Sequence, residues 1–357
     1  MDEKKREELL FRNEELIRIL KKKIDKLCPE YVDLIAIYGS FARGDYDERS
    51  DVDVLVVIND ERGRAFAKSF IIGEVGYDFY ALSWENLEAD ADFNVFSLSR
   101  LVDSRTVWFR ESSVLSRFEK LRDKALAVIS GGVSPKLLDM AEDSLNYAIN
   151  AYGKAMLTED YGKMRFYSAG VIFGVSSAAS LMNATYFKLS DGRRMEEFQR
   201  MALPEGFAQC FMRIITEKRG IEIKSAMALL LRQMEAFLNQ LRGKYIRKKN
   251  PTPEELRGTY EEMYSNYRGK ILRARETQNP LAAFLAGAGC QDFYNDILKD
   301  CETQPMDLMK DFRASQLEMF AESFDKCLDE YKKQYDRQGM KVAKYESLKA
   351  FERDYLK

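Results

Sequence analysis

Histidine is absent from all 357 residues of the sequence. This absence excludes Ser-His and Cys-His catalytic pairs, zinc sites with histidine ligands, and group transfer through a modified histidine. Any proton transfer must therefore fall to carboxylates, lysine, tyrosine or metal-bound water.

Cysteine and long apolar runs are also scarce. The five cysteines show neither pairing nor metal-site spacing, which predicts reduced thiols in a cytoplasm: Cys28, Cys210, Cys290, Cys301 and Cys327. No stretch approaches the length of a membrane span, and the charged N-terminal residues do not resemble a signal peptide. We therefore expect a cytoplasmic protein with no membrane partner.

Neither sign of charge is in excess. Lys and Arg total 56 and Asp and Glu total 58, a formal net charge of −2. This balance removes the positive field of a dedicated nucleic-acid binder, so nucleic acid is not an expected partner. With 46% hydrophobic and 32% charged residues, the chain is typical of a globular protein, and its length allows two or three domains.

The most informative feature is a glycine-bracketed turn between two apolar segments, in the run IAIYGSFARGDYDERSDVDVLVVI (residues 35–58). Gly39 and Gly44 allow the backbone to turn sharply and to approach a phosphate. Ser40 can offer a hydroxyl to phosphate oxygens. Asp51 and Asp53 supply the hard anionic oxygens that Mg²⁺ prefers.

The spacing of these two aspartates predicts a strand over residues 51–58. On a strand, residues i and i+2 point to the same side about 6.6 Å apart, and their carboxylates can converge on two metal ions about 3.5–4 Å apart. On a helix they would diverge by roughly 200°. Residues 54–58 are apolar and mostly β-branched, which indicates a strand buried on both faces.

At these residues the chain resembles the DNA polymerase β-type nucleotidyltransferase superfamily, whose signature is Gly-Ser followed about ten residues later by Asp-x-Asp. Phe41, Ala42, Arg43 and Ser50 are also typical of its small bacterial members. Those members include the aminoglycoside and lincosamide nucleotidyltransferases and the minimal enzymes of toxin–antitoxin pairs. The resemblance covers about residues 32–83 and is specific for the superfamily but not for a substrate.

The resemblance implies roles for the motif residues. Gly39 and Ser40 would hold the triphosphate of an NTP co-substrate, and Asp51 and Asp53 would bind two Mg²⁺ ions. The family also uses a third carboxylate on a neighbouring strand, for which Asp78 is the candidate.

Two of these assignments stay open. Asp78, the lone acid of the strand-like run 75–83, is either a metal ligand or a general base, and Glu74 or Glu85 replaces it if the strand register differs.

Arg43 has two readings as well. It binds phosphate through its guanidinium, or it pairs with Asp45 or Asp47 within the turn.

The pattern along the chain predicts an α+β fold: a small mixed-sheet nucleotidyltransferase domain followed by all-α helical bundle domains. In residues 1–130 we expect helices at 2–27, 62–70, 93–101 and 113–129, and strands at 32–38, 51–58, 75–83 and 106–109.

Residues 130–135 form the expected linker, with Ser134 as N-cap and Pro135 at the first helical position. A helical bundle on the substrate side would occupy residues 134–249. A C-terminal helical domain of unassigned role would occupy residues 253–357, with an internal break at 282–289.

The favoured function is Mg²⁺-dependent transfer of a nucleoside monophosphate, AMP in the first instance, from NTP to a hydroxyl of a small molecule. By resemblance this acceptor would be an aminoglycoside or lincosamide, so that the protein confers antibiotic resistance. Asp139, Glu142 and Asp143 are available to a cationic acceptor. The alternatives are a toxin–antitoxin-type enzyme that modifies a protein or tRNA, and a catalytically inactive nucleotide-binding protein. The oligomeric state is open, a homodimer included.

Overall fold

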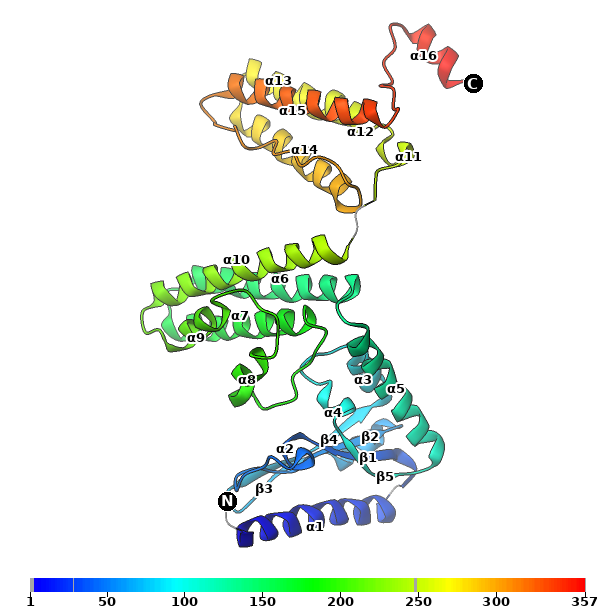
Figure 1. Cartoon of the computed structure of the whole chain (residues 1–357), viewed down its shortest axis with the longest axis vertical. Coiled ribbons are helices and arrows are strands. Elements are labelled where there is room, and N and C mark those ends of the chain that lie inside the picture. The colour runs from blue at the N-terminus through cyan, green and yellow to red at the C-terminus, as the bar shows by residue number, and fades with distance from the viewer. Residues whose placement is uncertain (1–2, 28, 247–248, 357) are drawn as a thin grey trace. The chain divides into compact units, whose positions relative to one another are not determined.

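The computed structural model describes residues 3–27, 29–246 and 249–356. It divides into two compact units, Met1–Ile246 and Arg247–Lys357 (Figure 1). The first holds a five-stranded mixed sheet followed by helices and the second is helical, so the predicted α+β class is confirmed. Among the described residues, no helix is long and apolar enough to cross a bilayer. Cys28 lies outside the described residues.

The sheet of the first unit has the strand order β3-β4-β2-β1-β5. Its strands are β1 Val32–Tyr38, β2 Asp53–Ile58, β3 Lys68–Ile72, β4 Val75–Ser83 and β5 Arg105–Phe109. β2 and β4 run parallel, and the other neighbours are antiparallel.

Successive residues of the central strands face opposite layers, as the period of a strand requires. Ile35 and Ile37 of β1 pack in the cluster that α1 (Glu3–Leu27) covers with its apolar side. Leu34 and Ala36 belong instead to the cluster formed with α3 (Trp84–Ala91), α4 (Ser99–Val102) and α5 (Ser112–Gly131). The prediction that β2 is buried on both faces is confirmed.

Three predicted elements differ from the structure. The strand expected over 51–58 begins only at Asp53. The helix expected over 62–70 is a 3₁₀ helix, Glu61–Phe66, followed by β3. The helix expected over 93–101 reduces to α4 and the turns before it. β3 is an edge strand with mostly exposed residues, so its backbone pairing with β4 decides its structure rather than an apolar pattern.

The rest of the first unit is helical. It contains α6 Pro135–Leu157, α7 Tyr161–Leu181, η3 Asp191–Arg193, α8 Arg194–Phe198, α9 Phe207–Thr216 and α10 Gly220–Tyr245. The predicted cap is confirmed, because the Ser134 side chain accepts from the Leu137 N–H and Pro135 occupies the first turn. One apolar cluster joins Phe118 of α5 to residues of α6 across the expected linker, and the three-domain division stays a prediction.

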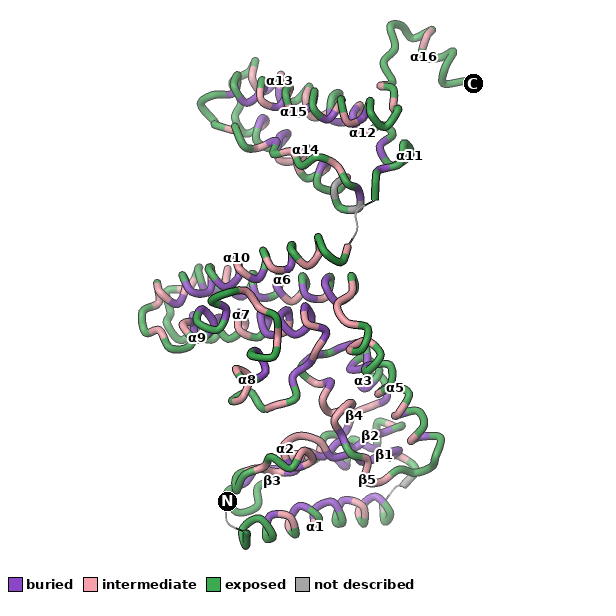
Figure 2. The backbone as a smooth tube through the Cα atoms, viewed as in Figure 1, coloured by how far each residue is buried: buried purple, intermediate pink, exposed green. Residues whose placement is uncertain are grey.

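The second unit has its own core, which Figure 2 shows in purple on its longer helices. Its helices are α11 Pro253–Leu256, α12 Thr259–Glu262, η4 Met263–Arg268, α13 Gly269–Glu276, α14 Pro280–Asp300, α15 Leu317–Arg337 and α16 Leu348–Tyr355. The break predicted at 282–289 is wrong, because these residues lie inside α14. A Cβ on Gly287 would lie 2.7 Å from both Met309 and Phe320, so this glycine serves close packing rather than a turn.

Candidate active site

The glycine turn lies against the first residue of β2. Tyr38, the last residue of β1, is paired with Asp53, and α2 (Gly39–Arg43) begins at the next residue. Gly39 has a φ of +71°, and a Cβ on it would lie 1.8 Å from the Oδ2 of Asp53. The position therefore requires glycine for its backbone and for its space, and the Asp53 carboxylate contacts the turn.

Gly44 closes the turn in the left-handed region, at a φ of +82°. Its N–H donates to the carbonyls of Ser40 (2.9 Å) and Phe41 (3.2 Å), and the N–H of Asp45 donates to the Ser40 carbonyl (3.1 Å). These hydrogen bonds hold residues 39–45 in a compact turn beside β2.

The predicted carboxylates lie close enough for their charges to act on the two aspartates of the motif. Val54 is paired with Phe79 across the parallel strands, so Asp53 and Asp78 each stand one residue before a paired position. Burial is the largest cause that raises the pKa of Asp53 to about 6; the negative charges of Asp51 and Asp78 contribute to this rise, and the charge of Arg43 opposes it. Burial also raises the pKa of Asp51, with a smaller contribution from Asp78.

Three residues were candidates for the third carboxylate: Asp78, Glu74 and Glu85. Of these, Asp78 is the one whose charge acts on both Asp51 and Asp53. Glu74 lies between β3 and β4, and Glu85 lies in the first turn of α3.

Within the described ranges, no three His, Cys, Asp or Glu side chains form a group that could hold a metal ion. The donor chemistry nonetheless fits a divalent cation, because carboxylate oxygens are the ligands Mg²⁺ prefers. The pKa of Asp53 is raised first by burial and then by the charges of Asp51 and Asp78, against the opposing charge of Arg43, and a bound cation would favour the charged form of this carboxylate. The two Mg²⁺ ions stay a prediction.

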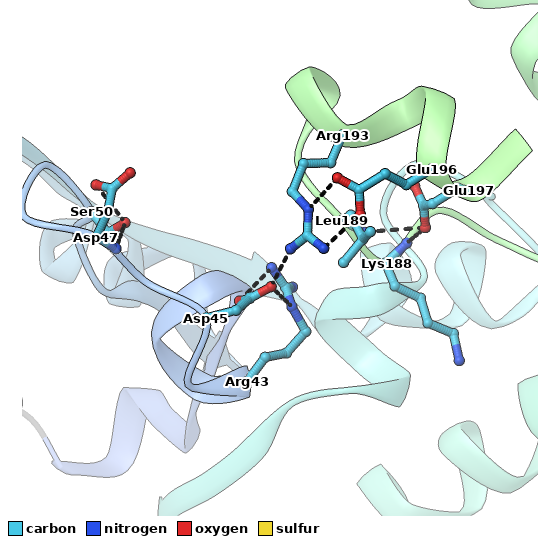
Figure 3. Close-up of polar contacts among 9 residues, drawn as sticks. All are labelled: Arg43, Asp45, Asp47, Ser50, Lys188, Leu189, Arg193, Glu196 and Glu197. Carbon is cyan, nitrogen blue, oxygen red and sulfur yellow. Dashed lines mark hydrogen bonds and ion pairs between the residues drawn. The ribbon is translucent and has the colours of Figure 1, made fainter. Parts of the chain in front are cut away.

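Arg43 pairs with Asp45 inside the turn, with its Nη2 3.2 Å from Oδ1 (Figure 3). It also lowers the pKa of Asp53, so its charge reaches the motif carboxylate. Asp47 instead organises the following loop, where its Oδ1 accepts from the Arg49 N–H (2.8 Å) and its own N–H donates to Ser50 Oγ (2.9 Å).

The structure adds neighbours that the sequence pattern missed. Arg193 lies 2.8 Å from Asp45, across 148 residues of sequence. Arg100 pairs with the buried Asp90 at 2.6 Å, and its charge acts on Tyr38. Burial, followed by the charge of Asp53, raises the pKa of Tyr38. No local sequence signal marks these residues, since tertiary folding alone brings them to the site.

Two of the three acids considered for a cationic acceptor are already paired. Arg242 binds Asp139 (2.7 Å) and Glu142 (3.0 Å). Asp143 lines a cavity of about 410 Å³ together with Asp92 and residues of α6 and α7.

Comparison with known proteins gives three findings. Residues 15–103 match the family model of the nucleotidyltransferase domain. The chain is 46% identical over 46 residues to a protein of Methanocaldococcus jannaschii named "putative protein adenylyltransferase". That match covers 13% of this chain and 46% of the relative's length. A nucleotidyltransferase-like protein from Exiguobacterium sibiricum 255-15 is similar with a TM-score of 0.34 and 12% identity over 87% of each chain.

Proposed function

We propose that the protein, whose residues 15–103 match the nucleotidyltransferase domain family, is an Mg²⁺-dependent transferase that moves AMP from ATP to a hydroxyl group of a small molecule. The observation that carries this proposal is the contact between the Asp53 carboxylate and Gly39, which joins the phosphate-binding turn to the acidic motif.

In this proposal each part of the site has one task. The turn from Gly39 to Gly44, with the Ser40 hydroxyl, binds the triphosphate, and Arg43 offsets part of its charge. Asp51 and Asp53 would hold Mg²⁺, which when bound would lower the pKa of the acceptor hydroxyl and stabilise the leaving pyrophosphate. Asp78 either completes this metal site or accepts the proton of the acceptor hydroxyl.

The reaction is an in-line displacement at the α-phosphorus. A bond forms between the acceptor oxygen and the α-phosphorus, and the bond from that phosphorus to the α–β bridging oxygen breaks. Pyrophosphate leaves with the electron pair, and the acceptor proton passes to a carboxylate, for which Asp78 is the candidate. No nucleophilic side chain is required, which agrees with a sequence that has no histidine.

A protein hydroxyl is the second candidate acceptor. The relative that matches over 46 residues is named for protein adenylylation, although this match spans less than half of the relative's length. The two candidate reactions use the same nucleotide site and differ only in the acceptor molecule, which is a small molecule in the first and a protein in the second.

The test of the function is incubation of the full chain with labelled ATP, GTP, CTP or UTP, Mg²⁺, and a panel of aminoglycosides and lincosamides. Label on a drug supports the small-molecule acceptor, and label on protein supports the second candidate. Absence of transfer to either with every nucleotide would contradict an active transferase.

Asp51→Asn is expected to lower the rate of transfer by at least about 10²-fold, because it removes a carboxylate from the proposed metal site. The rate is measured with the labelled nucleotide that the wild type uses, and a thermal melt checks the fold. Glu85→Gln is the matched control, since Glu85 is exposed in the first turn of α3. A fully active Asp51→Asn enzyme would show that the metal ligands are wrongly assigned.

A further inference from the structure

Asp45 lies between two guanidinium groups from distant parts of the first unit. Arg43 of α2 contacts its Oδ1 at 3.2 Å, and Nη1 of Arg193, at the end of η3, lies 2.8 Å from its Oδ2. Figure 3 shows Arg193 reaching from the helical segment toward the turn. The two arginines are therefore neighbours at the edge of the proposed nucleotide site.

The segment that carries Arg193 is fixed by its own contacts. Glu197, with 6% of its surface exposed, accepts the backbone N–H groups of Lys188 (2.6 Å) and Leu189 (3.2 Å). Arg193 donates hydrogen bonds from Nε and Nη2 to the carboxylate of Glu196, at 2.9 and 2.7 Å. Its remaining nitrogen, Nη1, donates to Asp45. The guanidinium is thus oriented before any ligand binds, which lowers the entropic cost of using it.

An NTP at the turn would place several negative charges beside Arg43. The charge of Arg43 already lowers the pKa of Asp53, and Arg43 shares the carboxylate of Asp45 with Arg193. Phosphate oxygens bind a guanidinium fork as carboxylate oxygens do, so a triphosphate would compete with Asp45 for both arginines.

From these contacts, and resting on the proposed function, we propose that Arg193 is a second phosphate-binding residue of the nucleotide site. Asp45 holds Arg193 beside Arg43 in the free protein, and the triphosphate replaces Asp45 as the partner of both. The segment 188–197, which includes η3 and most of α8, then takes part directly in nucleotide binding.

The test is equilibrium binding of ATP and of AMP to the full chain by calorimetry, with and without Mg²⁺. Arg193→Gln is expected to weaken ATP binding about tenfold, as for the loss of a charged hydrogen bond, and to leave AMP binding unchanged. Asp45→Asn is expected to tighten ATP binding by up to about fivefold, because it removes a competing exposed ion pair. A purely structural role of the ion pair would instead make both variants bind more weakly.

Arg64→Gln is the matched control, because Arg64 is exposed and pairs with Glu61 inside the 3₁₀ helix η2 (Glu61–Phe66). Its ATP affinity is expected to equal that of the wild type. Unchanged ATP binding in Arg193→Gln, or equal weakening of ATP and AMP, would overturn the inference.

The two proposals fail in different ways. If the wild type transfers label but Arg193→Gln binds ATP normally, the inference falls and the function stands. If the wild type transfers no label yet its ATP affinity depends on Arg193, the transferase falls and the inference stands. A wild type that does not bind ATP would overturn both.

Discussion

At the residue scale, the main cost of the site is the placement of carboxylates near one another in a half-buried position. Burial and the charges of Asp51 and Asp78 together hold the pKa of Asp53 at about 6. A folded protein without metal therefore binds a proton at Asp53 that the unfolded chain has already released. A divalent cation would relieve the same repulsion.

This difference predicts a pH dependence of stability. Because the folded pKa lies above the unfolded value, stability should fall by up to about 3 kcal/mol as the pH rises from about 4 to about 6, with no further loss above that. Urea unfolding in EDTA, compared between the wild type and Asp53→Asn, isolates the effect. A difference between the two proteins that does not change over this range would contradict the assigned environment of Asp53.

Gly39 sets a second requirement at this scale. Gly39→Ala would place a methyl group 1.8 Å from Asp53 Oδ2 and force a φ of +71° on a residue with a side chain. We expect loss of nucleotide binding and a destabilisation of at least about 1 kcal/mol from the backbone alone. Calorimetric ATP titration and urea unfolding measure the two effects. The control is Gly243→Ala, where a Cβ meets nothing within 4 Å.

At the element scale, α6 and α7 approach closely because α7 has small residues at the contact. A Cβ on Gly174 would lie 2.6 Å from the Ser144 carbonyl oxygen and 2.8 Å from the Ala148 Cβ. The helical part of the first unit therefore depends on backbone proximity as well as on apolar area.

Two glycine substitutions in these helices should have opposite effects. Gly174→Ala is expected to destabilise the protein by about 1–3 kcal/mol through overpacking. Gly153→Ala in α6, where a Cβ meets nothing within 4 Å, should stabilise it by about 0.5–1 kcal/mol through helix propensity. Urea denaturation of both variants measures the change in the free energy of unfolding. Stabilisation by Gly174→Ala would refute the close approach of α6 and α7.

The elements also show where local pattern suffices. β1 and β4 have the predicted bounds, because their apolar residues and flanking turns specify a strand locally. β3 was missed, because an exposed edge strand takes its structure from hydrogen bonding to β4. The break expected in α14 was wrong for a related reason, since Gly287 allows close packing against Phe320 of α15 and does not mark a turn.

At the scale of the whole molecule, each unit has a separate apolar core. The clusters of the first unit contain the sheet, α1 and the helices up to α10, and the cluster of the second unit runs from Leu256 to Tyr335. Every residue of the candidate active site lies in the first unit.

A fragment of residues 1–246 is therefore expected to fold and to bind ATP with the affinity of the full chain. Calorimetric titration and a thermal melt of the fragment measure both properties, and residues 247–357 should give a separate unfolding transition. An unfolded fragment would show that the first unit needs the second unit in order to fold. A folded fragment with weaker ATP binding would show that the second unit contributes to the nucleotide site.

The sequence by itself determined the chemical character of the candidate site. This character follows from local backbone geometry and side-chain type, which can be judged without knowledge of the fold. It rests on Gly39 and Gly44, on Asp51 and Asp53, and on the absence of histidine. Tertiary structure alone decided which distant groups reach that site. Arg193 and Arg100 lie far from the motif in sequence, and only the packing of helical segments near the sheet brings their charges to Asp45 and Tyr38.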